Sequence, residues 1–274
     1  MITKTDAVVL KSMKFRGTSK IVTFYSRRYG KLKGIAKGAR ETKSKFGAAL
    51  EPMTQVALVL YKKEHRELQF ISQCDVIRPY KKIHSEIERM SVTLTVLELI
   101  NQLTHEEEEN PLLYALLTET LEELELAPKN FINLFYAFEV RLCAIFGFAP
   151  SFGLCLRCGR EMDGVTGKLV VFQLARGGLA CSACCESLSS HSYQELLTRR
   201  GNRVEMRGEN LRLSLRTARI LGRLLSAKLK SVTSLVCTES VGNEIEAALR
   251  LYLRCHFENL RPLKSLELYR TVTG

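Results

Sequence analysis

Four cysteines in the middle of the chain have the spacing of a metal site. They form two C-x-x-C pairs with 22 residues between them, Cys155 with Cys158 and Cys181 with Cys184. Two residues between thiols let a tight turn point both sulfurs at one ion, and two such turns complete a tetrahedron. Four thiolates leave no position open for water, so the spacing predicts one structural zinc ion (Zn2+) rather than a catalytic one. Two alternatives stay open: an iron–sulfur cluster, which uses the same ligands, and a set of buried core thiols.

The surroundings of the two pairs differ. Gly159 follows the first pair and relaxes its turn, whereas no glycine follows the second, where Cys185 could replace Cys184 as a ligand. The N-terminal segment lacks the features of a signal peptide, and no stretch approaches the ~18 apolar residues of a membrane span. We therefore expect a cytoplasmic protein without disulfides. The remaining cysteines are expected to be core thiols: Cys74, Cys143, Cys237 and Cys255.

The positive charge of the chain is concentrated at its N-terminal end. The formal net charge is +12, and residues 1–46 carry thirteen basic and only two acidic side chains. A charge that served only solubility would be scattered along the chain, so this local excess predicts a polyanionic partner. A basic face that only keeps the protein soluble stays the alternative.

Part of this basic segment has the period of a strand. Lys31, Lys33 and Lys37 would share one strand face, as a row that matches a phosphate backbone. The candidate DNA-binding side chains are Lys11, Lys14, Arg27, Lys31, Lys33, Lys37, Arg40, Lys43 and Lys45. The aromatic residues between them would either stack on bases or, as the favoured interpretation, fill a barrel core: Phe15, Phe24, Tyr25, Tyr29 and Phe46.

The order of expected elements divides the chain. Residues 1–80 contain five apolar runs separated by turn residues, at 7–10, 21–25, 31–37, 56–61 and 68–71. Five strands of this length suit a small closed barrel, of either the OB or the SH3-like type. A helical period follows over 81–274, and a cysteine-rich module at about 151–190 interrupts it.

Several details of the helical region are open to test. The first apolar stripe is formed by Ile83, Ile87, Met90, Leu94 and Leu97. Asn110 followed by Pro111 predicts a helix start, and later helices are expected at about 215–229 and 241–252. The four glutamates at 106–109 are expected to form a solvated loop between two helices.

The chain carries no catalytic constellation. Residues 159–164 begin like a phosphate-binding loop, but Val165 stands where that motif needs lysine. The His65-Arg66-Glu67 segment resembles part of a zinc deaminase motif, whose second half requires a proline before the cysteine pair, and neither pair here has one. We therefore expect a non-enzymatic protein.

Five segments, in their order and spacing, resemble the RecO family of bacterial recombination and DNA-repair proteins: 7–10, 36–40, 47–52, 147–150 and 261–265. The resemblance covers nearly the whole chain. It implies an α+β multidomain protein, with an N-terminal OB-fold β-barrel followed by an α-helical domain that carries the four-cysteine zinc insertion. It also implies binding of single- and double-stranded DNA, strand annealing, and joint action with RecR to load RecA onto strands coated by single-strand binding protein (SSB), in the cytoplasm at the nucleoid. A zinc-ribbon RNA-binding or transcription-associated protein stays the alternative, because the same basic barrel would suit it.

The resemblance also implies a site in the helical domain for the acidic, hydrophobic C-terminal tail of SSB. Such a tail needs an apolar groove rimmed by cations. Two basic clusters could form that rim, and each could also be an ordinary solvated helix face. One contains Arg216, Arg219 and Arg223, and the other, slightly favoured because 261–265 is a matched segment, contains Arg250, Arg254, Arg261 and Lys264.

Overall fold

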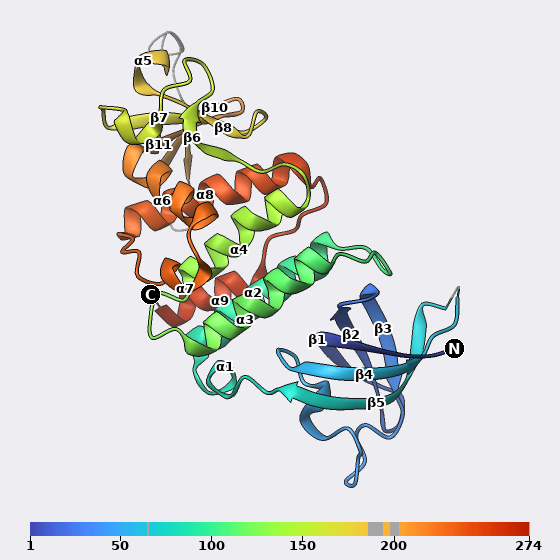
Figure 1. Cartoon of the computed structure of the whole chain (residues 1–274). Helices are drawn as coiled ribbons and strands as arrows, with labels where there is room; N and C mark the ends of the chain where they lie inside the picture. The colour runs from blue at the N-terminus through green and yellow to red at the C-terminus, as the bar shows by residue number, and fades with distance from the viewer. Residues whose placement is uncertain (65, 186–193, 198–202, 274) are drawn as a thin grey trace. The chain divides into compact units, whose positions relative to one another are not determined.

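The computed structural model describes residues 1–64, 66–185, 194–197 and 203–273. His65, residues 186–190 of the expected cysteine-rich module and the side chain of Cys185 lie outside the described residues. The chain divides into two compact units, Met1–Leu126 with Arg261–Gly274 and Ala127–Leu260, and its elements can be followed in Figure 1. No helix in the described ranges is long and apolar enough to cross a lipid bilayer.

Five strands of the first unit close into a barrel, in the order β1-β2-β3-β5-β4. They are β1 (Ile2–Phe15), β2 (Ser19–Ser26), β3 (Gly30–Ala36), β4 (Gln55–Tyr61) and β5 (Leu68–Arg78). Neighbouring strands are antiparallel except β3 and β5, which pair in parallel between Lys33 and Ile35. A short 3-10 helix, η1 (Gly47–Leu50), lies between β3 and β4. The predicted OB-type barrel is confirmed.

Strand β1 is much longer than the run predicted at 7–10. Its first half pairs with β4 and its second half with β2, and the register shifts between Val9 and Lys11. Such a bulge bends a strand, which lets β1 serve both neighbours and close the barrel. The sequence pattern missed the first half because its buried residues are Thr3 and Thr5, whose polarity hides the apolar alternation.

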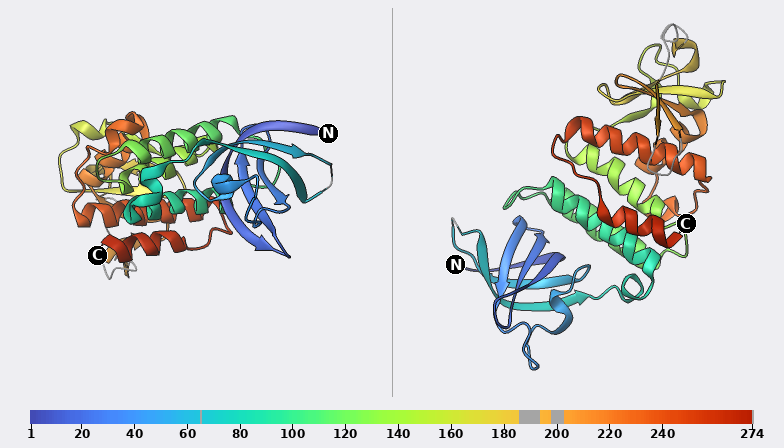
Figure 2. Two further views of the ribbon diagram at one scale, coloured as in Figure 1. Left: turned by 90° about the horizontal axis from the view of Figure 1, so that it is seen from below. Right: turned by 180° about the vertical axis from the view of Figure 1, so that it is seen from behind.

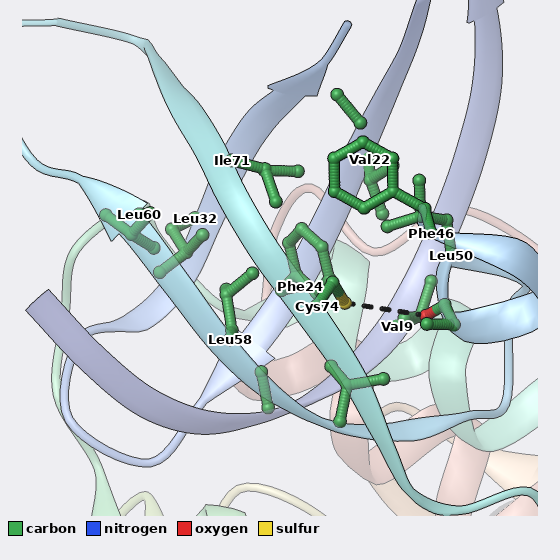
Figure 3. Packing of buried hydrophobic residues seen from close by; sticks show 14 residues of the cluster. Val9, Val22, Phe24, Leu32, Phe46, Leu50, Leu58, Leu60, Ile71 and Cys74 are labelled. Carbon is green, nitrogen blue, oxygen red and sulfur yellow. Dashed lines mark hydrogen bonds between the residues drawn. The ribbon is translucent and has the colours of Figure 1, made fainter. Parts of the chain in front are cut away.

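The barrel interior is a cluster of fourteen buried residues (Figure 3). Phe24 projects from β2 and Phe46 from the segment before η1, and both are buried. Burying a Phe or Leu side chain contributes about 1.5–3 kcal/mol to folding. Cys74 lies in the same core with its Sγ 3.7 Å from the Ala49 carbonyl oxygen, and burial raises the pKa of its thiol to about 12. Cys74 is therefore a neutral core thiol, as predicted.

Three helices follow the barrel within the first unit: α1 (Lys81–Ser85), α2 (Ile87–Leu103) and α3 (Pro111–Leu126). The predicted continuous stripe beginning at Ile83 is wrong, because Glu86 is extended and separates α1 from α2. Ile83 is buried, whereas Ile87 is 52% exposed. The predicted start at Asn110 is confirmed, since its side-chain oxygen accepts a hydrogen bond from the Leu113 N–H.

Helix α9 (Lys264–Thr273) completes the first unit by packing along α2 (Figure 2). Its start is held by side chains of α2. The Glu98 carboxylate accepts hydrogen bonds from the N–H groups of Lys264 and Ser265, at 3.1 and 2.9 Å. The Gln102 side chain accepts a third from the Arg261 N–H. The family-matched segment 261–265 is therefore the place where the chain end joins the first unit.

The second unit combines helices with a six-stranded sheet. Its main helices are α4 (Ile132–Ile145), α6 (Leu215–Ser226), α7 (Leu229–Val232) and α8 (Glu239–His256). The sheet order is β6-β8-β7-β11-β10-β9, with strands β6 (Ser151–Cys155), β7 (Leu169–Gln173), β8 (Gly178–Ala180), β9 (Gln194–Leu197), β10 (Arg203–Arg207) and β11 (Asn210–Ser214). The cysteine-rich module is thus part of a sheet that runs to Ser214, beyond the expected end at residue 190. Of the expected core thiols in this unit, Cys143 is buried and Cys237 half-buried, but Cys255 is exposed.

Candidate metal centre and nucleic-acid interface

The four paired cysteines meet at one point of the second unit. The Sγ atoms of Cys155, Cys158, Cys181 and Cys184 all lie within 4.8 Å of one another. This separation fits four sulfurs around one tetrahedral ion, with metal–sulfur distances of about 2.3 Å for zinc. Cys155 and Cys181 are buried, whereas Cys158 is exposed. The cluster therefore lies at the surface of the module, with its first and third ligands turned inward.

Different turns position the two pairs. At the first, β6 ends at Cys155, and Gly159 adopts a φ of 71° while its N–H donates to the Cys155 carbonyl oxygen at 2.9 Å. At the second, the chain enters the short helix α5 (Ser182–Cys185), and the Cys184 N–H donates to the Cys181 carbonyl oxygen at 3.0 Å. A helical turn brings the second pair of sulfurs together, so no glycine is needed there.

The thiols interact strongly with the backbone and with each other. Burial acts to raise the pKa of Cys155, but backbone N–H donors, among them those of Cys158 and Cys181, outweigh it and lower the pKa to about 6. Hydrogen bonds that the Cys184 thiol donates to the Cys181 and Cys158 sulfurs raise the pKa of Cys184 to about 12. The four sulfurs cannot all be thiolates so close together unless a cation neutralises them, which is the chemistry of a metal site.

The candidate DNA-binding side chains fall into two groups on the barrel. Seven are exposed: Lys11, Lys14, Arg27, Lys37, Arg40, Lys43 and Lys45. Two of these also hold loops, since Arg40 donates to the Gly17 carbonyl oxygen and Lys45 to that of Ser72. The other two, Lys31 and Lys33, are half-buried on the outer side of β3. Lys31 donates to the Asn101 carbonyl oxygen at 2.9 Å, and burial lowers its pKa. Its ammonium group therefore bonds within the first unit.

Most of the candidate stacking aromatics belong to the interior. Phe24, Tyr25 and Phe46 are buried, as the core interpretation expected. Tyr29 is half-buried, and its hydroxyl group lies 2.5 Å from that of Thr3. Phe15 is half-buried at the end of β1, with the Arg16 guanidinium 5.4 Å from its ring centre.

The structure reveals another apolar surface that the sequence did not indicate. Residues paired across successive strands form one row on the outside of the barrel, which we call the outer apolar row: Met13, Ile21, Ile35, Phe70, Tyr61 and Ile2. Met13, Tyr61 and Ile2 are 46%, 43% and 59% exposed, and the other three are half-buried. The rings of Phe70 and Tyr61 lie 5.8 Å apart.

Cations flank the outer apolar row. The next register row on one side contains Lys11, Thr23 and Lys33, paired across β1, β2 and β3. On the other side, Lys37 follows β3 and places its Nζ 5.9 Å from the centre of the Phe70 ring. The surface therefore offers aromatic and aliphatic faces between two sets of positive charges.

One of the two basic clusters expected to hold an acidic tail borders a groove. Arg216, Arg219 and Arg223 lie on the exposed side of α6, and Lys168 also lines the groove. The groove has a volume of about 710 Å³ and includes four apolar side chains, Leu215, Ile220, Leu235 and Val236, of which Val236 is 68% exposed. Arg216 donates to the Val236 carbonyl oxygen, and Arg219 lies 3.7 Å from the exposed Asp163 carboxylate.

The C-terminal cluster is divided between the two units. Arg250 and Arg254 belong to α8, whereas Arg261 and Lys264 belong to the first unit, where their N–H groups are bound by α2. Burial raises the pKa of Glu139 well above its usual value, and the nearby positive charge of Arg250 partly opposes this shift. Arg254 is exposed. None of these four residues lines the groove beside α6.

The closed barrel and the four-cysteine cluster define an OB-barrel protein with a candidate structural metal site in its second unit. Comparison with known proteins agrees with this class. Residues 1–80 match the family model "Recombination protein O N terminal", and residues 84–198 match "Recombination protein O C terminal".

Full-length relatives carry the same assignment. The chain is 31% identical over 272 residues to the DNA repair protein RecO of Chloroherpeton thalassium, with 98% of both chains covered. It is 30% identical over 273 residues to RecO of Salinibacter ruber, covering 100% of this chain and 95% of the relative. With RecO of Chlorobium luteolum the identity is 35% over 193 residues, covering 68% and 73%. The chain belongs to the RecO family of DNA repair proteins.

Proposed function

We propose that this chain is a recombination mediator. Its barrel binds single- and double-stranded DNA, it anneals complementary strands, and together with RecR it helps load RecA onto single strands coated by SSB. It works by binding rather than by bond chemistry, in the cytoplasm at the nucleoid. The observation that carries this proposal is the outer apolar row with cations on both sides.

Single-stranded DNA exposes base faces that a duplex hides. Base stacking on aromatic side chains contributes about 1–3 kcal/mol per base and tolerates any sequence. Phe70 and Tyr61 supply two rings, and adjacent strands about 4.8 Å apart extend the row around the barrel. Lys11 and Lys37 would contact the phosphates on either side of the stacked bases.

Duplex DNA would use only the exposed cations. Contacts between lysines and phosphates give affinity without sequence information, and they release condensed counterions. The same contacts neutralise the repulsion between two single strands. A surface of this kind therefore supports annealing as well as binding.

The metal would be a structural zinc ion held by Cys155, Cys158, Cys181 and Cys184. The buried ligands and the four-sulfur set support a closed site, in which the ion contributes to the folding of the module. Cys158 and Cys184 would supply the outer ligands.

The groove beside α6 is the better of the two expected sites for the SSB tail. It combines apolar side chains with a rim of cations, as an acidic peptide with a hydrophobic end requires. Arg219 and Arg223 would bind the carboxylates of the tail. The C-terminal cluster is less suitable because Arg250 is engaged with Glu139.

An annealing assay tests the proposal. Complementary labelled strands are coated with SSB, and strand pairing is followed by fluorescence with and without the protein. Faster pairing is expected with the protein, and an unchanged rate would contradict the mediator role. Titration of DNA and RNA oligonucleotides of one sequence addresses the alternative, because preferential binding of RNA would favour an RNA-binding or transcription-associated protein.

A further inference from the structure

The four consecutive glutamates 106–109 form an exposed loop between two helices, as expected, and this loop also contacts the barrel. This acidic loop connects α2 to α3 and follows the outer edge of β3. The Glu107 N–H donates to the Lys31 carbonyl oxygen at 2.8 Å, and Glu106 forms a parallel bridge with Lys31. Because β3 pairs with β5 only from Lys33 onward, this part of its edge is open and the loop fills it.

The fit of the acidic loop against β3 is close. Gly30 begins β3 with a φ of 57°, and a Cβ atom at this position would lie 1.8 Å from the Glu108 carbonyl oxygen. Any larger residue at position 30 would therefore push the loop away from the strand. The contact is specific to this backbone arrangement and is more than an attraction between opposite charges.

The carboxylates of the acidic loop pair with barrel lysines. Glu106 forms an ion pair with Lys33, and Glu107 forms one with Lys62 at 2.9 Å. Lys33 belongs to the register row that flanks the outer apolar row, and Lys62 directly follows Tyr61 of that row. These two carboxylates thus occupy positions at which phosphates would be bound by the same lysines.

We propose that the acidic loop is a built-in competitor for DNA phosphates, which Glu106 and Glu107 replace at Lys33 and Lys62 in the DNA-free protein. The inference rests on the proposed function of the barrel as a DNA-binding surface. A single small anion gains too little from one lysine to displace a loop that is also held by its backbone, whereas a DNA strand contacts several cations at once. The loop thereby makes the barrel bind long polyanions in preference to small anions.

The test compares two doubly substituted proteins with equal net charge. Glu106→Gln/Glu107→Gln removes both competing carboxylates while keeping the shape of the side chains. Glu109→Gln/Glu119→Gln is the matched control, since both residues are exposed and make no ion pair among the described residues. Binding of a fluorescent oligothymidylate is measured by anisotropy. The first variant should bind about three- to tenfold more tightly than wild type, as expected for two weak ion pairs, and the control much less so.

A third substitution locates the effect. Lys33→Gln should weaken binding more in the Glu106→Gln background than in wild type, because only there is Lys33 unpaired before DNA arrives. Gly30→Ala displaces the loop without changing any charge, and it should also tighten DNA binding. This variant provides the test if the Gln variants do not fold. If the two double variants bind DNA with equal affinity, the acidic loop does not compete with DNA. That result would leave the proposed DNA site itself standing. Absence of binding in every variant would instead contradict the proposed function.

Discussion

The Nζ atom of Lys37 lies 5.9 Å from the centre of the Phe70 ring, immediately beyond the end of β3. The pair places a cation suited to a phosphate next to a ring suited to a base. The residues are 33 positions apart in the chain and become neighbours only because β3 and β5 pair in parallel. Their proximity makes the two kinds of DNA contact separable by substitution.

Phe70→Ala should weaken binding of single-stranded DNA by about 1–3 kcal/mol, because one stacking face is removed. Duplex binding should change little, since paired bases cannot stack on the barrel. Anisotropy titrations of one sequence in both forms measure the difference. Phe146→Ala, which removes a half-buried aromatic from the second unit, is the control. If Phe70→Ala weakens binding of single strands and of duplex equally, Phe70 does not stack on bases.

Lys11→Ala/Lys37→Ala/Lys43→Ala should weaken binding of every DNA sequence to a similar degree. On single strands, the slope of log affinity against log salt should become shallower by about 0.7 for each phosphate that the variant no longer neutralises. The matched triple variant Lys129→Ala/Lys228→Ala/Lys230→Ala removes three exposed lysines of the second unit and should leave the slope unchanged. An unchanged slope in the first variant would place the DNA site elsewhere.

The purified protein should contain about one zinc ion per chain, bound by four sulfurs. Cys181→Ser should lose the ion and lower the unfolding temperature of the second unit, because metal binding is coupled to folding of the module. Cys255→Ser, at an exposed cysteine outside the cluster, should retain the zinc ion and the wild-type unfolding temperature. Elemental analysis, X-ray absorption and thermal unfolding provide the measurements. Iron with a visible chromophore, or a folded protein without metal, would contradict the zinc assignment.

Arg219→Glu/Arg223→Glu should reduce binding of a fluorescent SSB tail peptide at least tenfold, since two cations of the α6 groove become repulsive. Arg254→Glu is the control from the C-terminal cluster, and it avoids Arg250, whose reversal would place a second carboxyl group beside the buried Glu139. Loss of tail binding in Arg254→Glu alone would favour the C-terminal cluster. No binding to wild type would count against the mediator role.

Features set by local spacing could be predicted from the sequence. The cysteine pairs are each fixed by one turn, and the helix start at Asn110 depends on a cap three residues away, so both are visible in a short window. The outer apolar row could not be predicted in this way. Its members come from five strands, and only the register of those strands brings Met13, Ile35 and Phe70 together.

The contacts of the acidic loop with the barrel could not be predicted for a related reason. A run of four glutamates is polar enough to suggest full solvation, and nothing near it in the sequence offers a partner. Its partners, Lys31, Lys33 and Lys62, precede it by more than forty residues. The edge that the loop covers exists because β3 pairs with β5 over only part of its length, which the strand pattern does not reveal.

The hydrogen bonds between the start of α9 and the Glu98 carboxylate affect the order in which the first unit can fold during translation. The first unit contains the start of the chain and residues Arg261–Gly274, whereas the second is one continuous segment between them. During translation the barrel and the second unit can each emerge as an uninterrupted stretch, but the α2 surface that receives α9 must wait for it. At about 5–20 residues per second, that interval is roughly ten to thirty seconds. Over this time Glu98 and the surface of α2 that contacts α9 have no α9 to pack against on the nascent chain.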